Sequence, residues 1–192
     1  MFDEFLEKVR DTGMPAFPLA YGNPVSSAYG LLRAIGEDPY EDIKTDGSEP
    51  YYTVKERPLN DPENEYFRGL SWIMPVARHH HFFGSDGSNT GFGSPTHGPG
   101  QGKVGEEFSE TPDMDKYYKE TWQFGDSKYK KSAIDKGLQM RRDAYNEVER
   151  MAREDPDMYG DIADMGRYDL LLNNCHDYIT DAMWRGSGRS GR

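Results

Sequence analysis

The sequence predicts an α+β protein in which a small antiparallel sheet packs against helices. Residues 66–83 are rich in aromatic and β-branched side chains, and an Asp-Gly turn separates them from a short strand-like stretch at 90–93. This pattern is typical of a β-hairpin. Residues 130–154 repeat apolar side chains at helical spacing, and a second helical pattern begins at Cys175. Strands followed by helices favour the α+β class.

The composition excludes several classes of function. The chain has 192 residues and a net charge of −11, and 35% of its residues are hydrophobic. A negative chain does not suit nucleic acid as a partner, because phosphate binding needs a basic surface. Aromatic residues make up 13% of the chain, which is too many for a disordered protein. We therefore expect a folded protein, and its charge agrees with a neutral or cationic substrate or simply with solubility.

Cysteine content and hydropathy bear on the compartment. A single cysteine excludes an intrachain disulfide, so an oxidising compartment is not required. The first nine residues are acidic and amphipathic, and they lack the basic start and apolar run of a signal peptide. No stretch approaches the ~18 apolar residues of a membrane span. We expect a soluble protein without a signal peptide, either cytoplasmic or exported by a leaderless secretion route.

The chain is expected to contain three parts. Residues 1–65 are predicted to form an N-terminal helical extension and an exposed connection, residues 66–186 a core, and residues 187–192 a disordered tail. Within the extension, apolar spacing over 2–9 and a helix start at Asn23-Pro24 predict two helices. The connection is dominated by Asp, Glu, Pro and Asn, with one strand-like stretch at 51–54. It is expected to contribute little to the core.

The segment that follows residues 66–83 is rich in glycine. Eight glycines fall between residues 84 and 105, which predicts a long loop after the hairpin. The run at 98–104 lacks the first P-loop glycine and the Ser/Thr after its lysine. We therefore expect no nucleotide site and no cofactor.

Helices dominate the predicted second half. Residues 115–124 are short, aromatic and compatible with a helix, and 130–154 form the strongest helix. Pro156 should end that helix, and 157–166 predict another short one. The last helix begins at Cys175, and its apolar residues give it an inward face.

Cys175 is the leading candidate nucleophile. Asn174 is a good N-cap and Asp177 stands three residues later, so the cysteine is predicted to lie in the first turn of a helix. The unpaired amides and the dipole at a helix start favour an anion, which predicts a lowered thiol pKa and a reactive thiolate. The alternative is that a lone cysteine is a small buried hydrophobic residue.

Three consecutive histidines, His79, His80 and His81, are the candidate bases. Alternation along a strand places His79 and His81 on one face and His80 on the other, so at least one faces an adjacent site. His176 follows Cys175 directly, and on a helix it points about 100 degrees away from the cysteine. The alternative is that the histidines are solvated and idle on the surface.

A metal site is the third interpretation of these histidines. His79 and His81 form a His-x-His pair, and Asp86 or His97 would be the further ligand. No repeated ligand spacing supports that set, and we expect no metal.

The order of these features resembles the permuted branch of the papain-like, NlpC-like cysteine peptidase superfamily, which includes PPPDE-type peptidases and lecithin:retinol acyltransferase relatives. In that branch the histidine strand precedes an Asn-Cys-x-x-Phe/Tyr string that opens the nucleophile helix. Residues 174–178 match this string, and residues 80–83 match the histidine strand. Short chains of this kind are also similar to secreted bacterial effectors and toxin domains.

The resemblance implies roles for the candidate residues. Cys175 would be the nucleophile, with His81 preferred over His80 and His79 as the base. Oxyanion or orienting groups would come from a further set of side chains: Asn173, Asn174, Asn89 and His97.

The implied activity is hydrolysis of an amide in a peptide, a cell-wall stem peptide or an isopeptide. Such a protein would take a peptide or peptidoglycan-type substrate and, as a toxin, an inhibitory immunity protein as partner. Two alternatives stay open: a thiol acyltransferase of the same fold, and a non-enzymatic interaction protein with an inert, buried cysteine.

Overall fold

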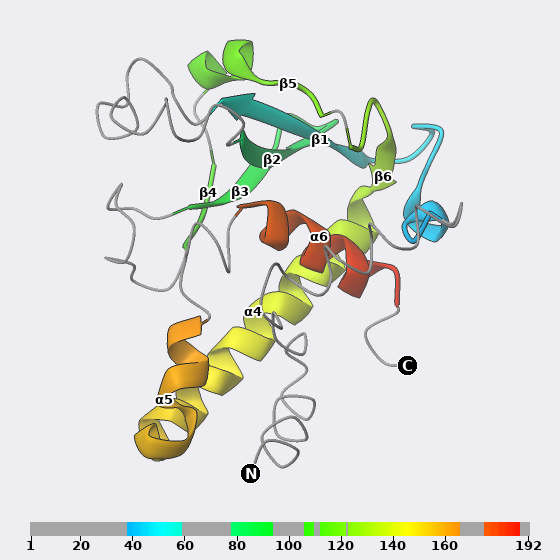
Figure 1. The fold of residues 1–192 in the computed structure, drawn as a ribbon. Coiled ribbons are helices and arrows are strands. Elements are labelled where there is room, and N and C mark those ends of the chain that lie inside the picture. Colours follow the sequence, from blue (N-terminus) through cyan, green and yellow to red (C-terminus); the bar gives the residue numbers. More distant parts are fainter. Residues whose placement is uncertain are drawn as a thin grey trace.

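Figure 1 shows the computed structural model, with the elements coloured along the chain. It describes residues 38–58, 78–93, 106–109, 112–121, 123–165 and 175–188. The strands are β1 (Tyr51–Pro58), β2 (Arg78–Gly84), β3 (Asn89–Gly93), β4 (Glu106–Phe108), β5 (Lys119–Glu120) and β6 (Lys128–Lys130). The helices are η1 (Glu41–Ile43), η2 (Pro112–Tyr117), α4 (Lys131–Glu154), α5 (Pro156–Met165) and α6 (Cys175–Gly186).

The strands form one antiparallel sheet in the order β4-β3-β2-β1-β5, and β6 also pairs with β1. β1 and β2 pair from Tyr52 opposite Gly84 to Pro58 opposite Arg78. The predicted hairpin between β2 and β3 is present, and its turn uses Gly87 at a φ of 83°, a backbone conformation that favours glycine. The expected α+β class with a small antiparallel sheet is confirmed.

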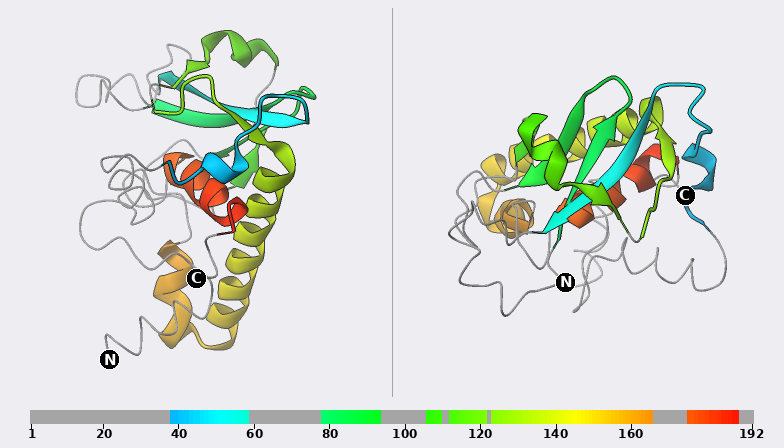
Figure 2. Two further views of the ribbon diagram at one scale, coloured as in Figure 1. Left: turned by 90° about the vertical axis from the view of Figure 1, so that its right-hand side faces the viewer. Right: turned by 90° about the horizontal axis from the view of Figure 1, so that it is seen from above.

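The helices and the sheet form layers. α6 and α4 cover one face of the sheet, and η2 lies on the other side of the sheet from α6 (Figure 2). The core lies between the sheet and the two helices, and its largest fully buried side chains include Phe82, Tyr178, Ile134, Ile179 and Met183. Phe92 of β3 stacks on Tyr178 at a centroid distance of 5.3 Å, so the first turns of α6 are fixed against the hairpin.

Two glycines let α6 lie directly against α4. A Cβ on Gly137 of α4 would fall 1.9 Å from the Ala182 carbonyl oxygen, and a Cβ on Gly186 would fall 2.4 Å from the Ala133 carbonyl oxygen. The two backbones therefore touch where glycine removes the side chains. This contact sets the position of α6 and, with it, of Cys175.

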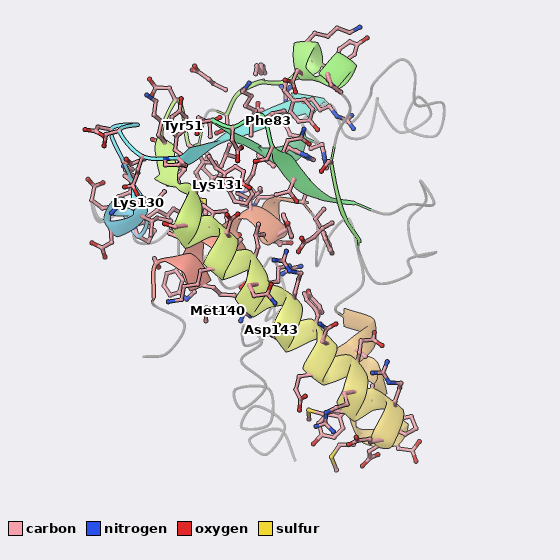
Figure 3. All side chains as sticks on the ribbon, turned by 180° about the vertical axis from the view of Figure 1, so that it is seen from behind. Tyr51, Phe83, Lys130, Lys131, Met140 and Asp143 are labelled. Atoms are coloured by element: carbon pink, nitrogen blue, oxygen red, sulfur yellow. The ribbon has the colours of Figure 1, made fainter. Side chains whose placement is uncertain are left out.

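The start of α4 is tied to the sheet. Lys131, labelled in Figure 3 where β6 passes into α4, donates from Nζ to the Tyr52 hydroxyl at 2.9 Å and lies 4.6 Å from the centre of that ring. Beyond the sheet, α4 continues as a projecting helix and α5 packs along its far part (Figure 1). The break between them falls at Asp155-Pro156, as the sequence predicts.

Part of the expected organisation is corrected. Residues 37–65 were expected to form an exposed connection, but β1 runs through the sheet, with Tyr52 4% and Val54 1% exposed. Its alternating side chains face the helices, so it supplies core despite the polar residues around it. The sheet thus draws strands from both sides of the boundary expected at residue 65.

Other expectations concern residues that the structure does not describe. The two helices predicted before residue 37, most of the loop 84–105 and most of the tail 187–192 lie outside the described residues. Among the helices of the described ranges, none is long and apolar enough to cross a membrane.

Candidate active site

α6 begins at Cys175, so the cysteine lies in the first turn of a helix, as the sequence predicts. Its side chain is buried, with 2% exposed. The sulfur lies against the backbone of β2: the His80 N–H donates to Sγ at 3.3 Å, and Sγ donates to the Arg78 carbonyl oxygen at 3.5 Å. The thiol therefore joins the helix start to the histidine strand.

The pairing of β2 with β3 explains why these two backbone groups are available to bind the thiol. The Gly84 N–H donates to the Ser88 carbonyl oxygen, so the even-numbered residues of β2 direct their backbone groups toward β3. The β2–β3 pairing ends at His81 opposite Gly91. Sγ binds the next groups along this edge, at His80 and Arg78. The sulfur thus continues the ladder where the strand partner stops.

The expected lowering of the Cys175 pKa is wrong. The amides of His80 and His176 do lower the pKa of the thiol, as expected of donors at a helix start. Burial has the larger and opposite effect, because it disfavours the thiolate, and the pKa is raised to about 11. At neutral pH the cysteine in this state is a neutral thiol.

His80 is the histidine on the same face of β2 as the cysteine. Its ring lies 5.1 Å from that of His176 in an edge-on arrangement, and its Nε2 lies 3.6 Å from Oε2 of Glu56. Within the described ranges, Nδ1 of His80 is buried and has no hydrogen-bond partner. Burial, with smaller contributions from His176 and Arg78, lowers the pKa of His80 to about 3, so its imidazole is neutral.

Glu56 is the acidic residue that sequence reasoning missed. It lies directly opposite His80 in the β1–β2 register and is 4% exposed. Its Oε2 has no hydrogen-bond partner among the described residues, and its Oε1 lies 3.7 Å from Nε of Arg78. The orienting candidates Asn89 and His97 follow the histidines in sequence, whereas the acid that lies near His80 comes from the preceding strand. The signal was the alternation of Tyr52, Val54 and Glu56 along β1.

His79 and His81 face the other side of the sheet, toward Tyr118. His79 Nε2 and His81 Nδ1 lie 3.4 Å apart, and His81 Nε2 lies 3.0 Å from Oδ1 of Asn89. Gly91 makes room for the His81 ring, since a Cβ there would lie 2.0 Å from Nδ1. Asn89 therefore orients His81, on the face away from α6. The arrangement brings His80, not the preferred His81, to the cysteine.

The remaining candidates are placed in part. Asn173, Asn174 and His97 lie outside the described residues. His176 directs Nε2 to the Gln123 side-chain oxygen at 2.7 Å. In the described ranges, no group of three His, Cys, Asp or Glu side chains could hold a metal ion.

The arrangement can perform nucleophilic chemistry. The His80 imidazole and the Glu56 carboxylate lie on the face of the sheet toward α6, and the thiol contacts the backbone of the same strand at a helix start that supplies amide donors. Among the described residues, one nitrogen of that imidazole has no hydrogen-bond partner. Comparisons with protein-family models, curated proteins and solved structures gave no match. The functional assignment therefore depends on these residues themselves.

Proposed function

We propose that the protein is a cysteine hydrolase that cleaves an amide bond, with Cys175 as nucleophile, His80 as general base and Glu56 as the orienting carboxylate. One observation supports this most strongly: the cysteine sulfur contacts the backbone of His80, one ring nitrogen of which lies near an acid while the other has no hydrogen-bond partner among the described residues. A buried polar atom without a partner costs about 1–3 kcal/mol, and functional sites are where such costs are commonly found.

The division of the two ring nitrogens suits a base. Nε2 faces Glu56, so Nδ1 is the nitrogen that takes the thiol proton. Nδ1 is bonded to Cγ, which keeps it near the His80 backbone that holds the sulfur. Once protonated, His80 is a cation 3.6 Å from a buried carboxylate oxygen, and the charge pair becomes favourable in a site with little water.

The reaction follows from these positions. Sγ of Cys175 bonds to the carbonyl carbon of the substrate as its proton passes to Nδ1 of His80. The amide at the start of α6 donates to the oxyanion that forms. The C–N bond then breaks, and the leaving nitrogen takes the proton from His80. Water attacks the resulting thioester, loses a proton to His80, and releases the acid and the thiol.

The resemblance to the permuted papain-like superfamily agrees with this proposal. It places a histidine strand before an Asn-Cys string that opens a helix, and here β2 precedes and contacts α6. The substrate would then be a peptide, a cell-wall stem peptide or an isopeptide, and the chain a secreted effector or toxin. Those identities remain part of the proposal.

Burial of the cysteine favours a second function. With 2% of its surface exposed and a raised pKa, Cys175 would serve as a packing residue of a non-enzymatic interaction protein. In that case the thiol would only join α6 to β2.

Alkylation of the native protein separates the two functions. Because the chain has one cysteine, intact mass reports modification of Cys175 alone. Iodoacetamide should label the native protein at pH 7, and His80→Gln should slow labelling about 100-fold if His80 takes the proton. The matched control, His81→Gln, removes an imidazole on the other face and should leave the rate nearly unchanged.

The same preparation then identifies the reaction. Peptide amides, isopeptides and peptidoglycan fragments are offered to the wild type and to Cys175→Ala, and thioester adducts are sought by mass spectrometry. Labelling only after denaturation, together with inertness toward every substrate, would establish the packing role instead.

A further inference from the structure

Arg78 is the cation of the candidate site. It begins β2, and its carbonyl oxygen lies 3.5 Å from Sγ of Cys175. Its side chain shares a face of the sheet with His80, because the two are two residues apart on a strand. This side chain is 30% exposed, whereas Cys175, His80 and Glu56 are buried. Arg78 is therefore where the site meets solvent.

The guanidinium group of Arg78 is incompletely used. Within the described part of the chain, its ionic contact is the one to Glu56, from Nε to Oε1 at 3.7 Å, which is longer than a charge-assisted hydrogen bond of about 2.7–2.9 Å. An arginine carries five N–H donors in a planar fork that matches a carboxylate. Its terminal nitrogens are thus available to an anion that approaches the sulfur.

We propose that Arg78 binds a carboxylate of the substrate, so that the enzyme cleaves amides whose acyl side carries a free carboxylate next to the scissile carbonyl. This inference depends on the proposed hydrolase function and names its substrate class. It replaces the expectation, based on net charge alone, of a neutral or cationic substrate. A net charge of −11 disfavours anions at long range, but a guanidinium on the residue whose carbonyl oxygen contacts the sulfur dominates within a few ångströms of that side chain.

Binding at Arg78 would also prepare the base. Glu56 is shared, with Oε1 toward Arg78 and Oε2 toward His80. A substrate carboxylate that pairs with the Arg78 guanidinium weakens the attraction between that guanidinium and Glu56. The Glu56 carboxylate can then pair with the His80 imidazolium, which forms when Cys175 gives up its proton. Substrate recognition and proton transfer are linked through one acidic residue.

Two alkylating probes of nearly equal size test this. Iodoacetate and iodoacetamide both react by displacement of iodide by Sγ, with the thiol proton passing to His80, but only iodoacetate carries a carboxylate beside the reacting carbon. The quantity measured is the ratio of the two rates at Cys175, with N-acetylcysteine as the reference thiol. We expect the wild-type ratio to exceed the reference ratio by about tenfold, since a bidentate pair readily contributes that much.

Substitutions at position 78 complete the test. Arg78→Gln should return the ratio to that of N-acetylcysteine, and Arg78→Lys should lie between, because lysine keeps the charge but loses the fork. Arg153→Gln, at an exposed position in the last turn of α4, is the control and should keep the wild-type ratio. Sodium acetate should slow iodoacetamide labelling of the wild type more than sodium chloride of equal ionic strength.

The outcomes separate the two proposals. A wild-type ratio equal to that of N-acetylcysteine, or one that Arg78→Gln leaves unchanged, overturns carboxylate recognition while hydrolysis stands. Failure of both probes to label native protein overturns the hydrolase and this inference together. Should Arg78→Gln fail to fold, the wild-type ratio and the acetate protection still decide.

Discussion

The two faces of β2 hold histidines in different settings. On the face toward α6, His80 lies between Glu56 and His176, and its Nδ1 is buried without a hydrogen-bond partner in the described structure. On the opposite face, His81 has a partner at each nitrogen, His79 and Asn89. The second face is a satisfied polar cluster, whereas the first has one ring nitrogen that the proposed chemistry would use.

This difference shows how alternation along a strand gives consecutive identical residues different surroundings. Both faces are buried, and burial lowers the pKa of His79 as well as that of His80, so these two imidazoles are neutral. The contrast lies in the partners. The residues opposite in the register, Glu56 for His80 and Gly91 for His81, decide whether an imidazole is held beside an acid or packed over a glycine.

The largest expected effect is the loss of activity when His80 is replaced. His80→Gln should lower turnover by about 10²- to 10⁴-fold, because it removes the group that takes the thiol proton. His79→Gln and His81→Gln should lower turnover by less than about tenfold, since their side chains lie on the other face. Steady-state rates of the three variants against the substrate found by screening would show this. Equal losses in all three would remove the distinction between the two faces.

The sequence predicts the elements that carry the site. The Asp-Gly turn, the apolar spacing of α4 and the helix start at Cys175 each depend on neighbouring residues, and each is present. Alternation also shows that His80 opposes His79 and His81. It does not show which face α6 covers, because that depends on packing between residues about 95 positions apart.

The remaining errors also concern long-range packing. The local argument for a low thiol pKa is sound for an exposed helix start, and burial of Cys175 under the sheet reverses it. Glu56 could not be placed beside His80 without the β1–β2 register. The polar residues around β1 predict an exposed connection, although β1 is a central strand of the sheet. Charge, spacing and propensity indicate the elements, whereas strand partners decide the site.

A second, smaller effect is acid destabilisation to which both faces contribute. His79 is neutral when folded because burial, Arg57 and His81 lower its pKa well below 6.5. In the unfolded chain it protonates below about pH 6.5. The unfolded state then binds more protons, so stability is complete above 6.5 and falls as the pH drops. At pH 5 the loss is about 2 kcal/mol for one such histidine.

Urea unfolding at several pH values measures this contribution. His79→Gln should lower the slope of unfolding free energy against pH, between pH 6.5 and 5, by roughly one proton's worth, about 1.4 kcal/mol per pH unit. His80→Gln should change the slope similarly, although it alone removes activity. Glutamine can also change the unfolding free energy by the same amount at every pH, and such a change does not affect the slope. An unchanged slope in His79→Gln would show that this imidazole already protonates in the folded state.

The smallest expected effect concerns Glu56, the acid that lies near His80 on the face toward α6. Glu56→Gln keeps the shape of the side chain and removes its charge, so the imidazolium formed on His80 loses its counter-ion. We expect turnover to fall about tenfold, equivalent to about 1.4 kcal/mol.

Stability should not fall, because Oε2 of Glu56 makes no hydrogen bond within the described residues and an amide is less costly to bury than a carboxylate. Glu120→Gln, on the exposed strand β5, is the matched control and should change neither quantity. Turnover and melting temperature measured on the same preparations make the test, and a Glu56→Gln enzyme with full activity would leave His80 without its proposed carboxylate.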